Sequence, residues 1–145
     1  MEIYTIGFTK KSAQEFFETL KRAGIKLLID IRLNNQSQLA GFSKQDDLQY
    51  FLKEICGAEY QHEPLLAPTK DIIEGYRDKN LSWEEYEERF NKLLEDRQID
   101  KIIDKKLFEV PSVLLCSESK ADQCHRRLVA EYLRKHWGEV SIVNL

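Results

Sequence analysis

The stretch Leu27-Leu28-Ile29-Asp30-Ile31 decides the fold of this chain. It is apolar on both faces until Asp30, a pattern typical of a strand that helices cover on both sides of a parallel sheet. On its N-terminal side, residues 2–8 predict a short strand and residues 12–24 predict a helix with a Ser-Ala-Gln-Glu capping box and a glycine stop. A strand, a helix and a buried strand in this order indicate a βαβ unit.

The same alternation continues on the C-terminal side of this run. A polar loop covers residues 33–42, residues 43–57 predict a second helix with Ser43 as its N-cap, and residues 58–62 predict a third strand. The middle of the chain is predicted to be helical, with a second capping box at Ser82. The last three predicted elements are an apolar strand, a helix and a strand at residues 112–116, 122–138 and 140–143.

This order of elements predicts a Rossmann-like, three-layer α/β/α sandwich with a mostly parallel sheet of about five strands. A chain of 145 residues with 42% apolar and 32% charged residues is typical of one globular domain, here residues 1–145. The net charge of −3 provides no general attraction to nucleic acid or to anionic lipid, so either partner would need a local basic patch.

The expected location is the cytoplasm, without a membrane partner. The sequence starts with no signal-peptide pattern and contains no apolar run of membrane-spanning length. Three cysteines, Cys56, Cys116 and Cys124, are an odd number in such a chain, and we therefore expect reduced thiols.

Ligands of parallel sheets bind outside the carboxyl ends of the strands, where loops lead into helices. The most informative of these loops runs from Cys116 to Arg127. A helix N-terminus offers unpaired N–H groups, Arg126 can add two hydrogen bonds to an anion, and a cysteine in this field is biased toward the thiolate. We therefore predict that Cys116, Cys124 and His125 are catalytic. The alternative is that both cysteines are buried and inert and that the arginines are solvated.

Asp30 and Arg32 follow the second strand and would point to the same face. Either they would act at the site, with Asp30 as a fourth catalytic residue that orients His125 or Arg126 and Arg32 as a ligand contact, or they would form a local ion pair that positions the polar loop. Thr9 and Ser43 would add hydrogen bonds, although hydroxyl groups in loops are more often caps. Tyr60 and His62 would reach the same crevice, where a single histidine is more often structural, and aromatic residues at helical spacing are assigned to the core.

Metal binding competes for the same cysteines. Cys116, Cys124 and His125, together with Glu118 or His62, provide suitable ligand atoms. Their spacing matches none of the established zinc patterns, so we predict neither a metal nor a cofactor.

Several motifs resemble the DUF488 family, a family of domains of unknown function. They are Thr5-Ile6-Gly7-Phe8-Thr9, Asp30-Ile31-Arg32, Gly41-Phe42-Ser43, Leu115-Cys116-Ser117-Glu118 and Cys124-His125-Arg126. The resemblance spans nearly the whole chain and implies an α/β fold but no established general activity. Asn34-Asn35-Gln36 departs from the proline and basic residues that the family often has there. A looser resemblance to rhodanese-like domains concerns architecture only.

The resulting hypothesis is a cysteine-dependent transferase or hydrolase for a small anionic or sulfur-bearing substrate, with Cys116 as nucleophile and His125 as acid or base. The expected substrate-binding residues are Arg32, Arg126, Glu118, Ser43 and Thr9. One alternative is a non-catalytic nucleotide or nucleic-acid binding module, and another is a metal-binding or redox-sensing domain. The basic residues available for nucleic acid are Lys10, Lys11, Arg126, Arg127 and Arg134.

Overall fold

The computed structural model describes residues 1–35, 41–117 and 123–145. In this part of the chain a parallel sheet has the strand order β3-β2-β4-β1-β5. Its strands are β1 (Glu2–Gly7), β2 (Leu27–Asp30), β3 (Glu59–His62), β4 (Ser112–Cys116) and β5 (Ser141–Asn144). The predicted mostly parallel sheet of about five strands is therefore confirmed.

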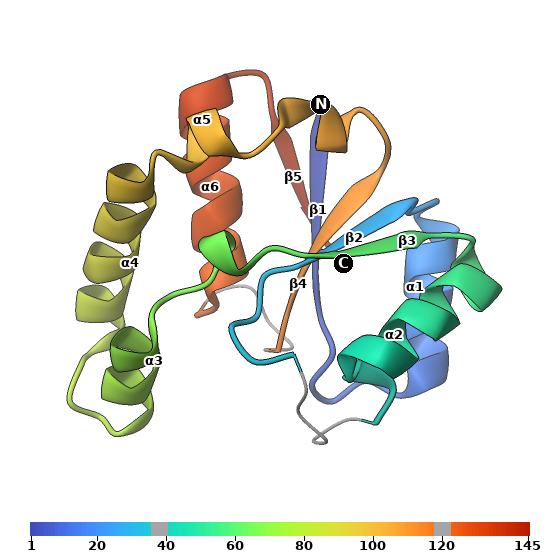
Figure 1. Ribbon diagram of the computed structural model, residues 1–145, viewed down its shortest axis with the longest axis horizontal. Coiled ribbons are helices and arrows are strands. Elements are labelled where there is room, and N and C mark those ends of the chain that lie inside the picture. Colours follow the sequence, from blue (N-terminus) through green and yellow to red (C-terminus); the bar gives the residue numbers. More distant parts are fainter. Residues whose placement is uncertain (36–40, 118–122) are drawn as a thin grey trace.

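Helices cover both faces of the sheet (Figure 1). They are α1 (Ala13–Arg22), α2 (Gln45–Phe51), α3 (Lys70–Arg77), α4 (Trp83–Arg97), α5 (Ile99–Ile102) and α6 (His125–Trp137). The helices α1 and α2 lie on one face, and α6 packs on the other with α4 outside it (Figure 1). This is the three-layer arrangement that the sequence predicts. Within the described residues, no helix has both the length and the apolar character needed to cross a bilayer.

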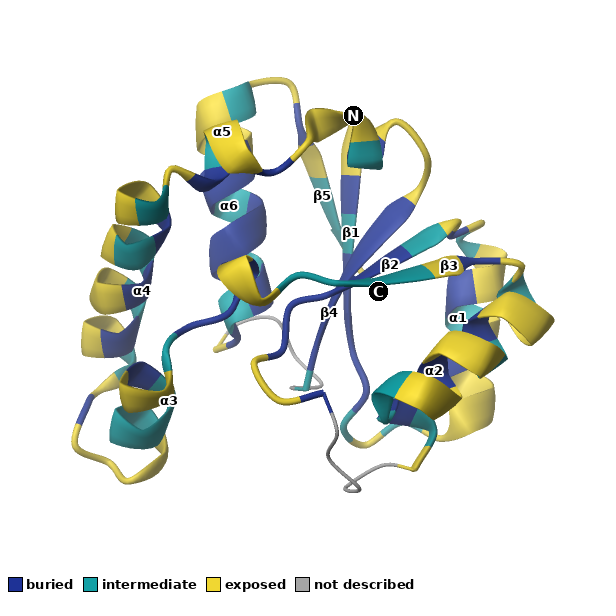
Figure 2. Ribbon diagram, in the orientation of Figure 1, coloured by how far each residue is buried: buried dark blue, intermediate teal, exposed yellow. Residues whose placement is uncertain are grey.

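The central strand β4 illustrates how the sequence builds two cores. Val113 and Leu115 pack with the apolar residues of α1 and α2, whereas Leu114 and Cys116 pack with those of α4 and α6. All of these side chains are fully buried (Figure 2). Side chains alternate between the faces of a strand, so an uninterrupted apolar run serves both layers.

The predicted ends of the elements agree with the structure to within a few residues. The Ser82 hydroxyl accepts from the backbone of Glu85 and completes the capping box of α4. The second helix begins at Gln45 with Lys44 as its N-cap, so the assignment of this role to Ser43 is wrong. The last helix begins at His125 instead of near residue 122, because Cys124 has an extended backbone and is the N-cap.

The connections place a crevice at the end of β4. The chain leaves β1 and β2 toward α1 and α2, but it leaves β4 toward α6 on the opposite face. Because β4 lies between β1 and β2 in the sheet, neighbouring connections separate here. Such a switch point is where ligands bind in open parallel sheets. Asp30 and Cys116 both lie at this edge, as the sequence predicts.

Candidate functional site

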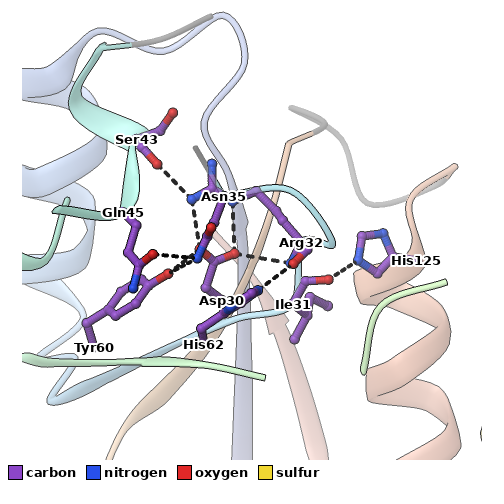
Figure 3. A network of polar contacts seen from close by, with 9 residues as sticks. All are labelled: Asp30, Ile31, Arg32, Asn35, Ser43, Gln45, Tyr60, His62 and His125. Carbon is purple, nitrogen blue, oxygen red and sulfur yellow. Dashed lines mark hydrogen bonds and ion pairs between the residues drawn. The ribbon is translucent and has the colours of Figure 1, made fainter. Parts of the chain in front are cut away.

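Asp30 and Arg32 form a buried ion pair at the end of β2 (Figure 3). The Arg32 Nε and Nη2 atoms donate to the two carboxylate oxygens over 2.8 and 2.7 Å. Nη2 also donates to the backbone oxygen of Ser43 over 2.7 Å. This is the local pair that positions the loop, one of the two roles considered from the sequence. Direct contact of Asp30, Arg32 or Ser43 with a substrate stays a prediction.

The network extends to β3 through Tyr60 (Figure 3). Its hydroxyl donates to Asp30 over 2.6 Å and accepts from the Asn35 amide over 3.0 Å. Burial, followed by the hydrogen bond to Asp30, raises the pKa of Tyr60 above its ordinary value. His62 Nε2 lies 2.8 Å from the carbonyl oxygen of Arg32. These contacts hold the segment after β2 against the neighbouring strand and account for the buried charges.

A second cluster contains Cys116, Cys124 and Arg126. A disulfide joins the two cysteines, with 2.02 Å between the sulfurs and 7.4 Å between the Cα atoms. The sequence-based expectation that both are reduced is therefore wrong for this structure. That expectation was based on the absence of a signal-peptide pattern, which concerns the compartment of the cell. It did not consider the fold, which brings the end of β4 and the start of α6 together.

Arg126 supplies a buried positive charge at the sulfurs. Its side chain is only 1% exposed, and Nη1 lies 3.3 Å from the sulfur of Cys116 and 3.9 Å from that of Cys124. Lys11, on the loop between β1 and α1, adds a second cation. Its pKa is lowered by burial and then by repulsion from Arg126. An anion between these two cations would relieve that repulsion.

His125 begins α6 directly after the N-cap cysteine. Its Nε2 lies 2.7 Å from the Ile31 carbonyl oxygen, which can only accept, so Nε2 carries the proton (Figure 3). Burial lowers the pKa of His125 to about 4 despite this hydrogen bond. The imidazole is therefore neutral near pH 7, and the lone pair is on Nδ1. A ring nitrogen and the two cysteine sulfurs lie within 4.8 Å of one another.

A cavity of about 450 Å³ opens beside Cys124. Its lining includes Ser117 and His125 at the sheet edge and Tyr76 and Trp83 from α3 and α4. Cys116 does not contribute to the lining that the described residues form. This volume is within the range of small-molecule sites. Of the two cysteines, Cys124 is the one that lines this space in the part of the chain that the structure describes.

The family of the chain follows from a comparison with family sequence profiles. The profile described as "Domain of unknown function DUF488" matches residues 12–133. The chain belongs to the DUF488 family. The match includes both clusters described above, and it assigns no activity to them. No curated protein and no solved structure matches the chain.

The remaining predicted site residues of this DUF488 domain have different positions. The Thr9 hydroxyl donates to the Ser117 carbonyl oxygen and ties the loop after β1 to the loop after β4. Glu118 lies outside the described residues. Arg127 forms ion pairs with Glu87 and Glu131, so it faces α4 and its own helix.

The three ligand atoms of Cys116, Cys124 and His125 are close enough to surround a metal ion. However, the positive guanidinium of Arg126 contacts both sulfurs, and it would repel a cation placed between them.

Sequence reasoning missed the aromatic wall of the cavity. Tryptophan and tyrosine residues at helical spacing were assigned to the core, and Tyr76 and Trp83 do pack against it. Both are only half-buried, however, and they also line the space beside Cys124. The periodicity of a helix separates buried from exposed faces but does not show which boundary residue borders a cavity. Gln123, which accepts a hydrogen bond from the Tyr76 hydroxyl over 3.3 Å, gave no sequence signal at all.

Proposed function

We propose that this DUF488 domain is a cysteine-dependent transferase or hydrolase for a small anionic or sulfur-bearing substrate, with Cys124 as the nucleophile. One observation carries the proposal: Cys124 lines the cavity and is the N-cap of α6, and its sulfur lies 3.9 Å from a buried guanidinium. Cys116, the nucleophile favoured from the sequence, is fully buried and does not line the cavity.

The electrostatics of the site support a thiolate at Cys124. Two unit charges about 4 Å apart attract by about 4 kcal/mol at the effective dielectric constant typical of protein sites. The helix N-terminus adds to this attraction. Burial opposes the charge because Cys124 is only 4% exposed. We expect the attraction to exceed this cost because the guanidinium is buried, so that solvent and salt screen the attraction only weakly.

The reaction has two covalent steps. The Cys124 thiolate attacks the electrophilic centre of a substrate R–X, an S–R bond forms, and X leaves with the electron pair of the R–X bond. An acceptor Y–H, which is water in hydrolysis, then attacks R. The neutral His125 imidazole takes the proton of Y–H at Nδ1, and the S–R electron pair returns to the sulfur as thiolate. The products are R–Y and X, and the proton on His125 passes to solvent.

The two cations explain the choice of an anionic substrate. Lys11 and Arg126 lie close enough for their repulsion to lower the pKa of Lys11. A carboxylate, sulfonate or phosphate group of a substrate would bind at the N–H groups at the start of α6, where the positive charge of both residues favours an anion.

The nucleic-acid alternative has weaker support. Arg127, one of its expected contacts, pairs with Glu87 over 3.1 Å and with Glu131 over 3.2 Å. These carboxylates offset the positive charge that a phosphate backbone would need.

Two alkylating reagents that differ in charge test the proposal. Reduced protein is treated with iodoacetate, which is anionic, and with iodoacetamide, which is neutral, and mass spectrometry measures the modification of each cysteine. Cys56, which is half-buried in the other layer, is the internal control. We expect Cys124 to react at least tenfold faster than Cys56 with iodoacetate. We also expect a higher iodoacetate-to-iodoacetamide rate ratio at Cys124.

The Lys11→Met variant separates the anion site from the nucleophile. It should reduce the rate ratio at Cys124 toward that at Cys56, while the iodoacetamide rate stays within about threefold of wild type because Arg126 is still present. The proposal fails if Cys124 reacts no faster than Cys56 with either reagent.

A further inference from the structure

We infer that this domain also reduces small disulfides, with Cys116 as the resolving cysteine behind Cys124. The inference rests on the Cys124 thiolate of the proposed function and adds a second, oxidoreductase activity to it. It starts from the disulfide between two cysteines. One of them, Cys124, lines the cavity, and the other, Cys116, does not contribute to the lining that the described residues form.

The positions of the two cysteines suit two successive attacks. Cys124 is 4% exposed and lines the cavity, so it is the cysteine of this pair that we expect an external disulfide to meet. Cys116 is 0% exposed at the end of β4, and its sulfur is within bonding distance of Cys124. An external molecule therefore meets Cys124 first. The Cys116 sulfur is already bonded to the Cys124 sulfur, so it is placed for the second attack.

The same guanidinium serves both attacks. Arg126 Nη1 lies 3.9 Å from the sulfur of Cys124 and 3.3 Å from that of Cys116. Thiol–disulfide exchange requires a thiolate as the attacking group. A fixed positive charge that contacts both sulfurs stabilises the negative charge first on Cys124 and then on Cys116.

The exchange proceeds in two balanced steps. The Cys124 thiolate attacks one sulfur of a disulfide R–S–S–R′, a Cys124–S–R bond forms, and R′S⁻ leaves and takes a proton from solvent. The Cys116 thiol then loses its proton to solvent, and its thiolate attacks the Cys124 sulfur. The Cys116–Cys124 disulfide forms and RS⁻ leaves. Two electrons pass from the protein to the substrate, and two molecules of a small monothiol, which become its disulfide, restore the reduced protein.

The anionic aromatic disulfide 5,5′-dithiobis(2-nitrobenzoate) provides a direct test, because each thiolate that it releases is coloured. Reduced Cys56→Ser protein is mixed with an equal amount of the reagent at low protein concentration. We expect two equivalents of thiolate per reagent molecule and no mass adduct on the protein. The second release should be first order and independent of protein concentration, because the Cys116 attack is intramolecular.

Two resolving-cysteine variants provide the matched control. Cys116→Ser and Cys116→Ala, each in the Cys56→Ser background and each checked for wild-type far-UV circular dichroism, should release one equivalent and keep a nitrobenzoate adduct on Cys124. If one of these variants does not fold, the other is sufficient. The count of released thiolate on the protein that keeps both Cys116 and Cys124 needs neither variant.

The outcomes separate the two proposals. If the first release is fast but the unsubstituted pair keeps a stable adduct and releases only one equivalent, the disulfide reductase activity is wrong and the nucleophilic role of Cys124 survives. If the first release is as slow as that of Cys56 in the Cys116→Ser/Cys124→Ser variant, both proposals are wrong.

Discussion

At the scale of single residues, His125 follows the proposed nucleophile Cys124 in the sequence and has a lowered pKa. Its imidazole has a pKa of about 4, below the ordinary value of 6.5, because burial disfavours the charged form. The unfolded chain therefore binds a proton at this residue between about pH 6.5 and pH 4, and the folded protein does not. The stability that this histidine contributes is fully present above pH 6.5 and is lost as the pH falls to about 4.

We predict that this loss amounts to roughly 3 kcal/mol in the free energy of unfolding. Urea unfolding at several pH values between 4 and 7 measures it, and the His125→Gln variant is the control. Because the other titrating groups are common to both proteins, the difference between their pH profiles isolates His125. Parallel profiles over this range would show that the imidazole is not buried in its neutral form.

The Asp30–Arg32 pair gives a second prediction at this scale. The side chains of these residues are 0% and 3% exposed, so removing one partner leaves a buried charge. Asp30→Asn and Arg32→Met should each lower the free energy of unfolding by about 3–5 kcal/mol. The double variant should cost less than the sum of the two, because neither charge is then left alone. Additive losses in denaturant unfolding would contradict a direct pair.

The exposed pair of Lys53 and Glu59 is a matched control for this experiment. Both side chains are more than half exposed, and solvent screens their attraction. Lys53→Met should leave the free energy of unfolding nearly unchanged. A loss as large as that of Arg32→Met would indicate that burial is not the cause.

The residues of the candidate site were predictable from the sequence only in part. The segment from Cys116 to Arg126 was recognisable because it leaves an apolar strand and enters a helix, and the structure brings its sulfurs and guanidinium together. The sequence did not predict which of the two cysteines lines the cavity. This depends on α3 and α4, which border the cavity and are distant in the chain.

At the scale of elements, the ends of helices were the easiest features to predict from the sequence, because capping depends on a few neighbouring residues. The hydroxyl of Ser82 accepts from Glu85 N–H over 3.1 Å, and the Glu85 carboxylate accepts from Ser82 N–H over 3.3 Å. Local contacts of this kind can be predicted from four residues of sequence. The start of α2 was missed because Lys44, its N-cap, makes no side-chain capping hydrogen bond and so gives no such signal.

We therefore predict that Ser82→Ala lowers the free energy of unfolding by about 0.5–2 kcal/mol. Ser82→Asp should retain most of the wild-type stability, because a carboxylate also accepts from the N–H groups of the first turn. Thermal and urea unfolding of the three proteins provide the comparison. Equal stability of the alanine variant and wild type would mean that the cap contributes nothing measurable to α4.

At the scale of the whole molecule, one sheet supports two apolar cores. Leu114 and Leu115 are adjacent and fully buried, but they face opposite layers. Both tryptophans, Trp83 and Trp137, pack in the layer of α4 and α6. The alternation of elements predicts the two layers, whereas the position of β4 between β1 and β2 has no counterpart in the sequence pattern, because strand order depends on contacts between distant segments.

Leu114→Ala and Leu115→Ala should each lower the free energy of unfolding by about 2–5 kcal/mol. In the Leu115 variant, the unfolding transition measured by tryptophan fluorescence should shift as much as the one measured by far-UV circular dichroism. We expect this although both tryptophans lie in the layer opposite Leu115. Such coincidence is expected if both layers unfold together. Separate transitions would show that the two layers are independent units.

The reactive thiolate of Cys124 is the central claim, and the pH dependence of its alkylation tests it most directly. Two proteins are compared, one with Cys124 as its single cysteine and one with only Cys56, whose pKa is raised by burial. The account predicts that iodoacetamide reacts with Cys124 with a midpoint well below the ordinary thiol value of about 8.5, whereas the midpoint for Cys56 is above it. A midpoint for Cys124 at or above that of Cys56 would contradict the account.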